Sequence, residues 1–163
     1  MKYLVVSTYE RISEKEGVFL TLDDAQRKMQ NLLEEHFSKR LEESLEDYGE
    51  DFDWGITERS CWSNASEEEF DVNIVEIETD NEYIVVSFKE RIFSYNGSFK
   101  TEVQAYSYME KLIKEYFEKD LEEDIADCEN SRDDEWGIES DFAWSNMNGK
   151  NFDINILTIK END

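Results

Sequence analysis

The sequence has no proline and only six glycines, two cysteines and one histidine among its 163 residues. Without proline it contains no proline-rich linker, and no glycine-rich loop offers the backbone amides that a phosphate-binding motif needs. Two cysteines and one histidine make neither a disulfide framework nor a set of zinc ligands. We therefore expect no cofactor and no dedicated metal site.

Long apolar segments are also missing. A membrane-spanning helix needs roughly 20 consecutive apolar residues, and no segment of the chain approaches that length. The apolar start, residues 1–6, is too short for the core of a signal peptide and is followed by a charge at Glu10. We expect a cytoplasmic protein that does not contact membranes, located in the host cytoplasm if it is viral.

Basic residues are scarce relative to acidic ones. The chain has 17 Lys and Arg against 42 Asp and Glu, which gives a formal net charge of −25. Direct binding of nucleic acid or of an anionic membrane requires clustered lysine and arginine, so both are disfavoured. A small domain usually carries a net charge of about 2–8 in magnitude, and a larger excess destabilises the compact state through self-repulsion. The excess therefore requires an explanation.

Three general explanations of the charge are disorder, adaptation to high salt and solubility. Acidic disordered chains lack aromatic and β-branched residues, whereas this chain is 39% hydrophobic and 13% aromatic. Its many lysines and bulky apolar residues argue against adaptation to high salt. Solubility does not require so large an excess. We conclude that the chain folds and that its acidic surface has a separate role.

An internal repeat is the strongest pattern in the sequence. Residues 3–48 align without gaps with residues 83–128, and 20 of these 46 pairs are identical. After a shift of two residues the match continues through three short blocks, Trp54-Gly55-Ile56 with Trp136-Gly137-Ile138, Trp62-Ser63-Asn64 with Trp144-Ser145-Asn146, and Phe70-Asp71 with Phe152-Asp153. The pattern predicts a tandem duplication, with one repeat in residues 1–80 and the other in 81–163.

Each repeat has the pattern of a β-α-β-β unit. Aromatic and β-branched residues predict strands near 3–9 and 83–88, and threonines at 21 and 101 resemble helix caps. Apolar residues then recur at helical spacing for about 26 residues, a helix about 39 Å long. Alternating residues predict closing strands at 54–62, 70–78, 136–144 and 152–160. The expected fold is α+β, with two pseudo-symmetric lobes that each pack one long helix on antiparallel strands.

A turn is expected between the first strand and the helix of each repeat. Asn96-Gly97 in the second repeat is a typical type I′ hairpin sequence, so it predicts a short extra strand there. The first repeat has no such pair at the equivalent positions.

Residues capable of catalysis are few and do not follow the repeat. His36 lies on the apolar stripe where the second repeat has Tyr116, which indicates an aromatic position at the edge of the core. Cys61 matches Ala143 and Cys128 matches Tyr48, so both thiols are interpreted as packing residues. The acids around Asp51 lack the register of a calcium-binding loop. We expect a protein that is not an enzyme.

The acidic residues are concentrated in two clusters. Each begins near the C-terminal end of a predicted long helix, and both are expected to bind a partner. The first contains Glu42, Glu43, Glu46, Asp47, Glu50, Asp51 and Asp53. The second contains Glu122, Glu123, Asp124, Asp127, Glu129, Asp133, Asp134 and Glu135.

The position of these clusters is unfavourable for stability. The helix dipole favours cations at a C-terminus, by about 0.3–1 kcal/mol per charge at low salt. Like charges four residues apart, such as Glu42 and Glu46, repel by a further 0.2–0.5 kcal/mol or so per pair. Local rules broken without compensation often mark a functional surface, although a merely solvated helix end would show the same pattern.

The amount of charge matches that of a short DNA duplex. B-DNA carries one charge per about 1.7 Å of axis, so 25 charges correspond to about 43 Å, or roughly twelve base pairs. In size, in charge and in the absence of catalytic motifs, the chain resembles the phage- and plasmid-encoded DNA-mimic proteins, which include anti-restriction and anti-CRISPR inhibitors. The resemblance implies an inhibitor, monomeric or homodimeric, that occupies the nucleic-acid site of a basic nuclease or CRISPR or restriction effector.

Two other functions remain open. An immunity protein that neutralises a basic toxin nuclease would have the same electrostatics. An interaction adaptor would instead bind through aromatic residues, with the two Trp-Ser-Asn segments as its site and the charge serving solubility. The tryptophans are interpreted mainly as core residues on the sheet face, so an exposed tryptophan would favour the adaptor.

Overall fold

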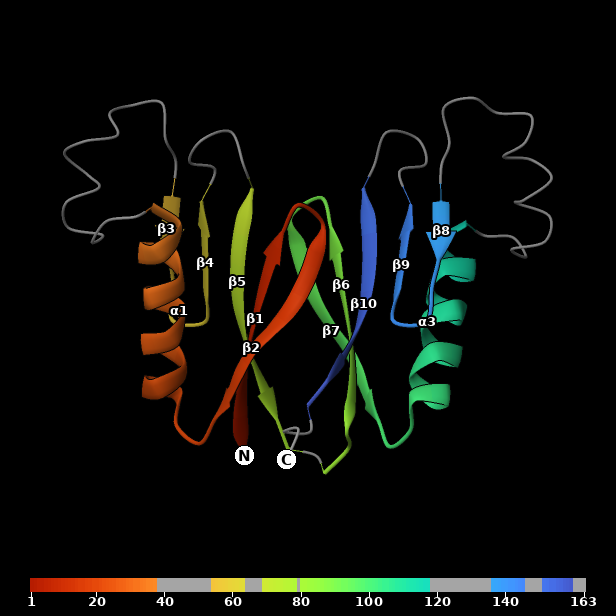
Figure 1. The fold of residues 1–163 in the computed structure, drawn as a ribbon, viewed down its shortest axis with the longest axis horizontal. Coiled ribbons are helices and arrows are strands. Elements are labelled where there is room, and N and C mark those ends of the chain that lie inside the picture. The colour runs from red at the N-terminus through yellow and green to blue at the C-terminus, as the bar shows by residue number, and fades with distance from the viewer. Residues whose placement is uncertain (38–53, 64–68, 79, 118–135, 146–150, 160–163) are drawn as a thin grey trace. The chain divides into compact units, whose positions relative to one another are not determined.

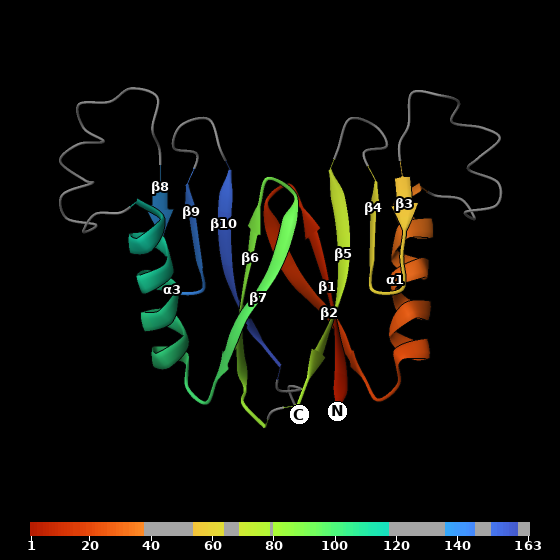
Figure 2. The same ribbon diagram turned by 180° about the vertical axis from the view of Figure 1, so that it is seen from behind.

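The computed structural model describes residues 1–37, 54–63, 69–78, 80–117, 136–145 and 151–159. Within them the chain is α+β, with two five-stranded antiparallel sheets and two helices. It divides into two compact units, Met1–Thr79 and Asp80–Asp163, called unit 1 and unit 2 below. The elements of each unit are shown from two sides in Figures 1 and 2.

Unit 1 contains β1 (Lys2–Tyr9), β2 (Ile12–Phe19), α1 (Leu22–Phe37), β3 (Trp54–Ile56), β4 (Ser60–Ser63) and β5 (Phe70–Ile77). The strands form one sheet in the order β2-β1-β5-β4-β3. Helix α1 packs on one face of that sheet (Figure 1).

Unit 2 contains β6 (Tyr83–Lys89), β7 (Ile92–Phe99), α3 (Glu102–Phe117), β8 (Trp136–Ile138), β9 (Phe142–Ser145) and β10 (Phe152–Thr158). Its sheet has the order β7-β6-β10-β9-β8, which is the order of unit 1 element for element. Helix α3 packs on one face of it (Figure 2).

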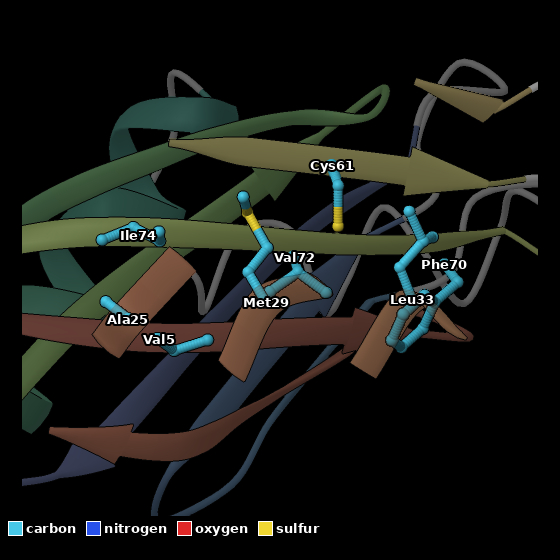
Figure 3. Close-up of a cluster of buried hydrophobic side chains, with 8 residues drawn as sticks. All are labelled: Val5, Ala25, Met29, Leu33, Cys61, Phe70, Val72 and Ile74. Carbon is cyan, nitrogen blue, oxygen red and sulfur yellow. The ribbon is translucent and has the colours of Figure 1, made fainter. Parts of the chain in front are cut away.

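The core of unit 1 lies between α1 and the sheet. Alternate residues of a strand point to one face, so β1 and β5 contribute Val5, Val72 and Ile74 to the side that faces the helix. Met29 and Leu33 project from α1 onto these residues (Figure 3). Full burial of an aliphatic side chain stabilises a fold by about 1.5–3 kcal/mol, so this cluster accounts for the docking of the helix.

Threonine caps start both helices, as the sequence predicts. The backbone N–H of Asp24 donates to Thr21 Oγ1 over 3.2 Å, and the Thr21 hydroxyl donates to the Asp24 carboxylate over 2.7 Å. In unit 2 the N–H of Gln104 donates to Thr101 Oγ1 over 3.3 Å. Each cap satisfies one of the amides that have no partner inside the first turn.

Both units have a hairpin before the helix. The single strand expected there in the first repeat is therefore wrong, whereas the extra strand expected in the second repeat is present but follows a different turn. The turns are Glu10-Arg11, with φ values of 47° and 73°, and Glu90-Arg91, with 48° and 66°. Two positive φ values in a two-residue loop define a type I′ turn, which usually contains Asn-Gly. Asn96-Gly97, the predicted turn, instead lies inside β7.

Asn96 is the extra residue of a β-bulge, because Tyr95 pairs with Val86 and Gly97 pairs with Val85. Its side-chain amide donates to Ser87 Oγ over 2.8 Å. In unit 1 Glu16 occupies the same place and accepts from the Ser7 hydroxyl.

The predicted single strands at 54–62 and 136–144 are also wrong, since each is a short hairpin. In unit 1 the turn between β3 and β4 is closed by Thr57, whose N–H donates to the Ser60 carbonyl over 2.7 Å. The Thr57 and Ser60 hydroxyls lie 2.8 Å apart. In unit 2 the N–H of Glu139 donates to the carbonyl of Phe142 over 2.7 Å. The later part of each predicted long helix, beyond 37 and 117, lies outside the described residues.

Candidate functional site

Every residue of the two predicted acidic clusters lies outside the described residues, in segments 38–53 and 118–135. The structure therefore neither brings these carboxylates together nor separates them. The clusters stay predictions from the sequence.

The acidic side chains that the structure describes are almost all on the surface. Asp71 and Asp153 are the buried ones among them, exposed by only 7% and 1%. They occupy equivalent places on β5 and β10, one residue after a phenylalanine in each case. The remaining described carboxylates are half-buried or exposed. The described units thus place their negative charge outside well-packed cores.

Each buried aspartate belongs to a row of residues that crosses the sheet on the face away from the helix. In unit 1, Gly55 on β3 lies opposite Trp62 on β4, which lies opposite Asp71 on β5. The row continues to Thr8 and Ser13, whose hydroxyls are 2.8 Å apart. The burial of a carboxylate costs free energy unless polar groups compensate for lost water, and these hydroxyls lie along the same row.

The row of unit 2 has the same first three residue types, Gly137, Trp144 and Asp153. Phe88 and Phe93 then take the places of the two hydroxyl residues. The sequence alignment contains the glycine, tryptophan and aspartate in matching blocks, but it does not show that the aspartate is buried. The burial of the aspartate was missed because an antiparallel strand in which polar and apolar residues alternate usually exposes the polar ones.

A flat indole explains the glycines of these rows. An added Cβ at Gly55 would lie 2.6 Å from Nε1 of Trp62, and one at Gly137 would lie 2.6 Å from Nε1 of Trp144. Such distances are far below van der Waals contact. The ring in each unit therefore lies against the backbone of the neighbouring strand.

The interpretation of Trp62 as a core residue is wrong. The β3–β4 turn sets Cys61 and Ser63 on the side of the helix, where both are buried. Trp62 consequently points to the opposite face and is 37% exposed, while Trp144 is half-buried. Unit 1 therefore has an exposed tryptophan, the feature that favours an aromatic adaptor.

His36 has the aromatic role that its alignment with Tyr116 predicts. Its ring stacks on Phe70 at a centroid distance of 4.5 Å, and Tyr116 stacks on Phe152 at the same distance. Tyr9 meets His36 edge-on at 6.2 Å, whereas Lys89 lies 5.1 Å from the Tyr116 ring. Burial, with a contribution from the charge of Glu90, raises the pKa of Tyr116.

Cys61 is a packing residue in the core of unit 1. Burial raises its pKa to about 12, and the negative charge of Asp71 acts in the same direction. The thiolate is the nucleophilic form of cysteine, so at neutral pH this side chain is an inert thiol. Cys128 lies outside the described residues.

An open cavity of about 660 Å³ lies in unit 2, between the end of β7 and the first turns of α3. Phe99 and Tyr108 form part of its apolar wall, and Lys100, Gln104 and Lys111 are among its polar residues. The described residues that line it include no carboxylate, cysteine or histidine, and therefore no acid–base pair or nucleophile with a base. The equivalent positions in unit 1 include Asp23 and Asp24.

Among the described residues no group of three His, Cys, Asp or Glu side chains is arranged to hold a metal ion. None of the described helices is long and apolar enough to cross a membrane. Comparisons with protein-family models, curated proteins and solved structures gave no match.

Proposed function

We propose that the protein is a non-enzymatic inhibitor that presents a DNA-like array of carboxylates to a basic, nucleic-acid-binding protein. Its targets would be nucleases or CRISPR or restriction effectors in the cytoplasm of a host cell, and its gene would belong to a phage or mobile element. The observation that carries this proposal is a net charge of −25 on a chain with two packed cores. Folding alone gives no reason for such a charge.

The proposal includes a tandem duplication. Its support is the 20 identities in 46 aligned pairs, together with the identical strand order of the two sheets. The matching glycine–tryptophan–aspartate rows also support it, because they are an unusual combination with the same pairing in both units. Two copies of one acidic unit would supply two sets of carboxylates, as a duplex supplies two rows of phosphates.

Exposure of the charge is what the proposed mechanism requires. Carboxylates can replace phosphates only if they are accessible to the lysines and arginines of the target. Of the described acids only Asp71 and Asp153 are buried, and ion pairs such as Arg27 with Asp24 neutralise few of the others. The acidic clusters at 42–53 and 122–135 would add the densest part of the array.

A competition assay tests this function. The protein is used to capture partners from extracts of the natural host at low and high salt, and the captured protein is purified. A fluorescent duplex of about twelve base pairs is then bound to that partner while the acidic protein is added. We expect displacement of the duplex, and affinity that falls steeply with salt, because salt screens exposed charges beyond about 8 Å at physiological strength.

A partner that holds the duplex and this protein at the same time would exclude mimicry. A toxin nuclease as the captured partner would assign the same electrostatics to an immunity protein. The control is the partner with duplex and bovine serum albumin, which is acidic but has no repeated array.

The exposure of Trp62 favours an aromatic adaptor as a second candidate. In that case the replacement Trp62→Ala should abolish partner capture, and capture should change little with salt because apolar contacts are not screened. Under the proposed inhibitor function the same replacement leaves capture within a fewfold of the original affinity.

A further inference from the structure

Strands β2 and β7 are the equivalent outer strands of the two sheets. Each has a neighbouring strand on one side only, β1 for β2 and β6 for β7, within the part of the chain that the structure describes. The opposite edge of an outer strand carries backbone N–H and C=O groups that the sheet does not use. Such an edge is a template for pairing with another strand.

The two edges differ in charge. The middle of β2 carries Glu14, Lys15 and Glu16, whereas β7 has no charged residue over its eight positions. Charged side chains on an outer strand are a common protection against unwanted pairing. Unit 1 therefore has that protection and unit 2 lacks it.

The unprotected strand also carries exposed apolar side chains. Ile92 is 69% exposed and Tyr95 is 41% exposed. From Arg91 to Lys100 the sequence contains no acid, although 42 acids are present in the chain. Two molecules with a charge of −25 repel each other, and this strand is a surface where that repulsion is weak.

We propose that a second copy of this chain pairs through β7, with the two β7 strands antiparallel across a twofold axis. An antiparallel edge is self-complementary, because each strand offers the same backbone groups to the other. Pairing joins the two unit 2 sheets into one continuous sheet and covers Ile92 and Tyr95. The dimer forms independently of any partner, so it does not rest on the proposed function.

Unit 1 provides the design of the test. The replacements Ser94→Glu and Tyr95→Lys give β7 the residues that β2 carries at equivalent positions, and they leave the net charge at −25. Sedimentation equilibrium of the full chain measures self-association of the original and the variant. We expect the original to dimerise and the double variant to have a dissociation constant higher by about tenfold or more. Circular dichroism checks that the variant keeps its fold.

The reverse variant, Glu14→Ser with Lys15→Tyr and Glu16→Asn, gives β2 the residues of β7 at the equivalent positions and changes the net charge only from −25 to about −24. With two uncharged edges per molecule, it should form species larger than a dimer. Dimerisation of the original should also strengthen with salt, since screening reduces the repulsion; partner binding changes in the opposite direction under the proposed function. A monomer at every concentration and salt, or a double variant that dimerises like the original, would overturn the proposal.

Discussion

The buried faces of the two helices carry nearly the same residues at the same spacing: Ala25, Met29 and Leu33 in α1, and Ala105, Met109 and Ile113 in α3. The outer strands β2 and β7 show the opposite relation, since the middle positions of one are charged and those of the other are not. Core residues are constrained by packing to native density, whereas exposed positions are not. The two units therefore agree where packing constrains the residues and differ where it does not.

The row of residues that crosses each sheet on the face away from the helix is partly the same in the two units and partly different. Both units retain the glycine, the tryptophan and the buried aspartate. Beside the aspartate, however, unit 1 has the Thr8 and Ser13 hydroxyls and unit 2 has the rings of Phe88 and Phe93. The glycine, tryptophan and aspartate thus have the same cross-strand pairing in both units, although the residues beside the aspartate differ.

Reversal of the charge of the acidic clusters should have the largest effect on partner binding, and the loss of affinity should be similar for the two clusters. The two variants change four acids each to lysine: Glu42, Glu43, Glu46 and Asp47 in one, Glu122, Glu123, Asp124 and Asp127 in the other. Coupling of close charge pairs across interfaces reaches about 1.5–7 kcal/mol, so we expect affinity for the partner to fall by about 100-fold or more. A titration with the captured partner, followed by fluorescence anisotropy, measures this affinity.

The same variants separate binding from stability. The sequence predicts that these acids follow a helix toward its C-terminus, where lysine is favourable, so the melting temperature should rise or stay unchanged. If both variants melt higher and still inhibit normally, the clusters are solvated helix ends. If only one variant loses affinity, the two units do not share the function.

Truncation of the core should cost both units similar stability. Met29 and Met109 are exposed by 1% and 0% at equivalent positions, and buried methionine to alanine typically costs about 2–5 kcal/mol. Met29→Ala and Met109→Ala should therefore lower the free energy of unfolding by comparable amounts in urea titrations. An exposed neighbour such as Gln30→Ala is the control, with an expected change within about 0.5 kcal/mol. A near-zero effect in one unit only would show that the equivalent cores are unequal.

The sequence predicted the parts of the fold that depend on long apolar patterns. The first strand, the capped start of the helix and the last strand of each repeat are confirmed, because each carries strong periodicity or a specific cap. The two hairpins of unit 1 were missed because their turns, Glu10-Arg11 and Thr57 to Ser60, contain neither glycine nor asparagine. Strand β2 reads Ile-Ser-Glu-Lys-Glu-Gly-Val-Phe, with too many charges to resemble a strand. It is held by pairing with β1, a tertiary effect that local propensity does not contain.

For the candidate site, the sequence shows the number of acidic residues but not their arrangement in space. The number and spacing of the acids are properties of the sequence, but the predicted cluster residues lie outside the described residues. The burial of Asp71 and Asp153 depends on which face of the sheet each residue takes. That face changes with a one-residue shift of register, and the unrecognised β3–β4 hairpin produces such a shift at Trp62.

Disruption of the glycine–tryptophan contact should lower the stability by a smaller amount, and by the same amount in both units. Gly55→Ala and Gly137→Ala place a Cβ 2.6 Å from an indole nitrogen, so the ring must move. Overpacking of this kind typically costs about 1–3 kcal/mol. In the background Trp62→Ala, the additional cost of Gly55→Ala should largely disappear, because the clash has been removed. Urea unfolding of the original protein, the two single variants and the double variant gives the coupling energy between Gly55 and Trp62. If the losses of stability of the two single variants simply add in the double variant, the contact is contradicted.

The smallest expected effect concerns the two type I′ turns. Glu10, Arg11, Glu90 and Arg91 all have positive φ, where an ordinary residue is disfavoured by about 1–2 kcal/mol. Asn-Gly suits both positions. Glycine, however, lowers the stability by up to about 1 kcal/mol, because it increases the entropy of the unfolded chain. The pair Glu10→Asn with Arg11→Gly, and its equivalent at 90 and 91, should therefore each stabilise the protein by about 0.5–1 kcal/mol. Thermal unfolding of both variants measures this, with Glu10→Gln and Arg11→Lys, which keep the side-chain sizes, as the control. Because the φ values of the two turns are nearly the same, unequal gains would mean that side-chain contacts of one Glu-Arg pair offset its strain. A gain in stability with loss of partner binding would instead place that turn in the interface.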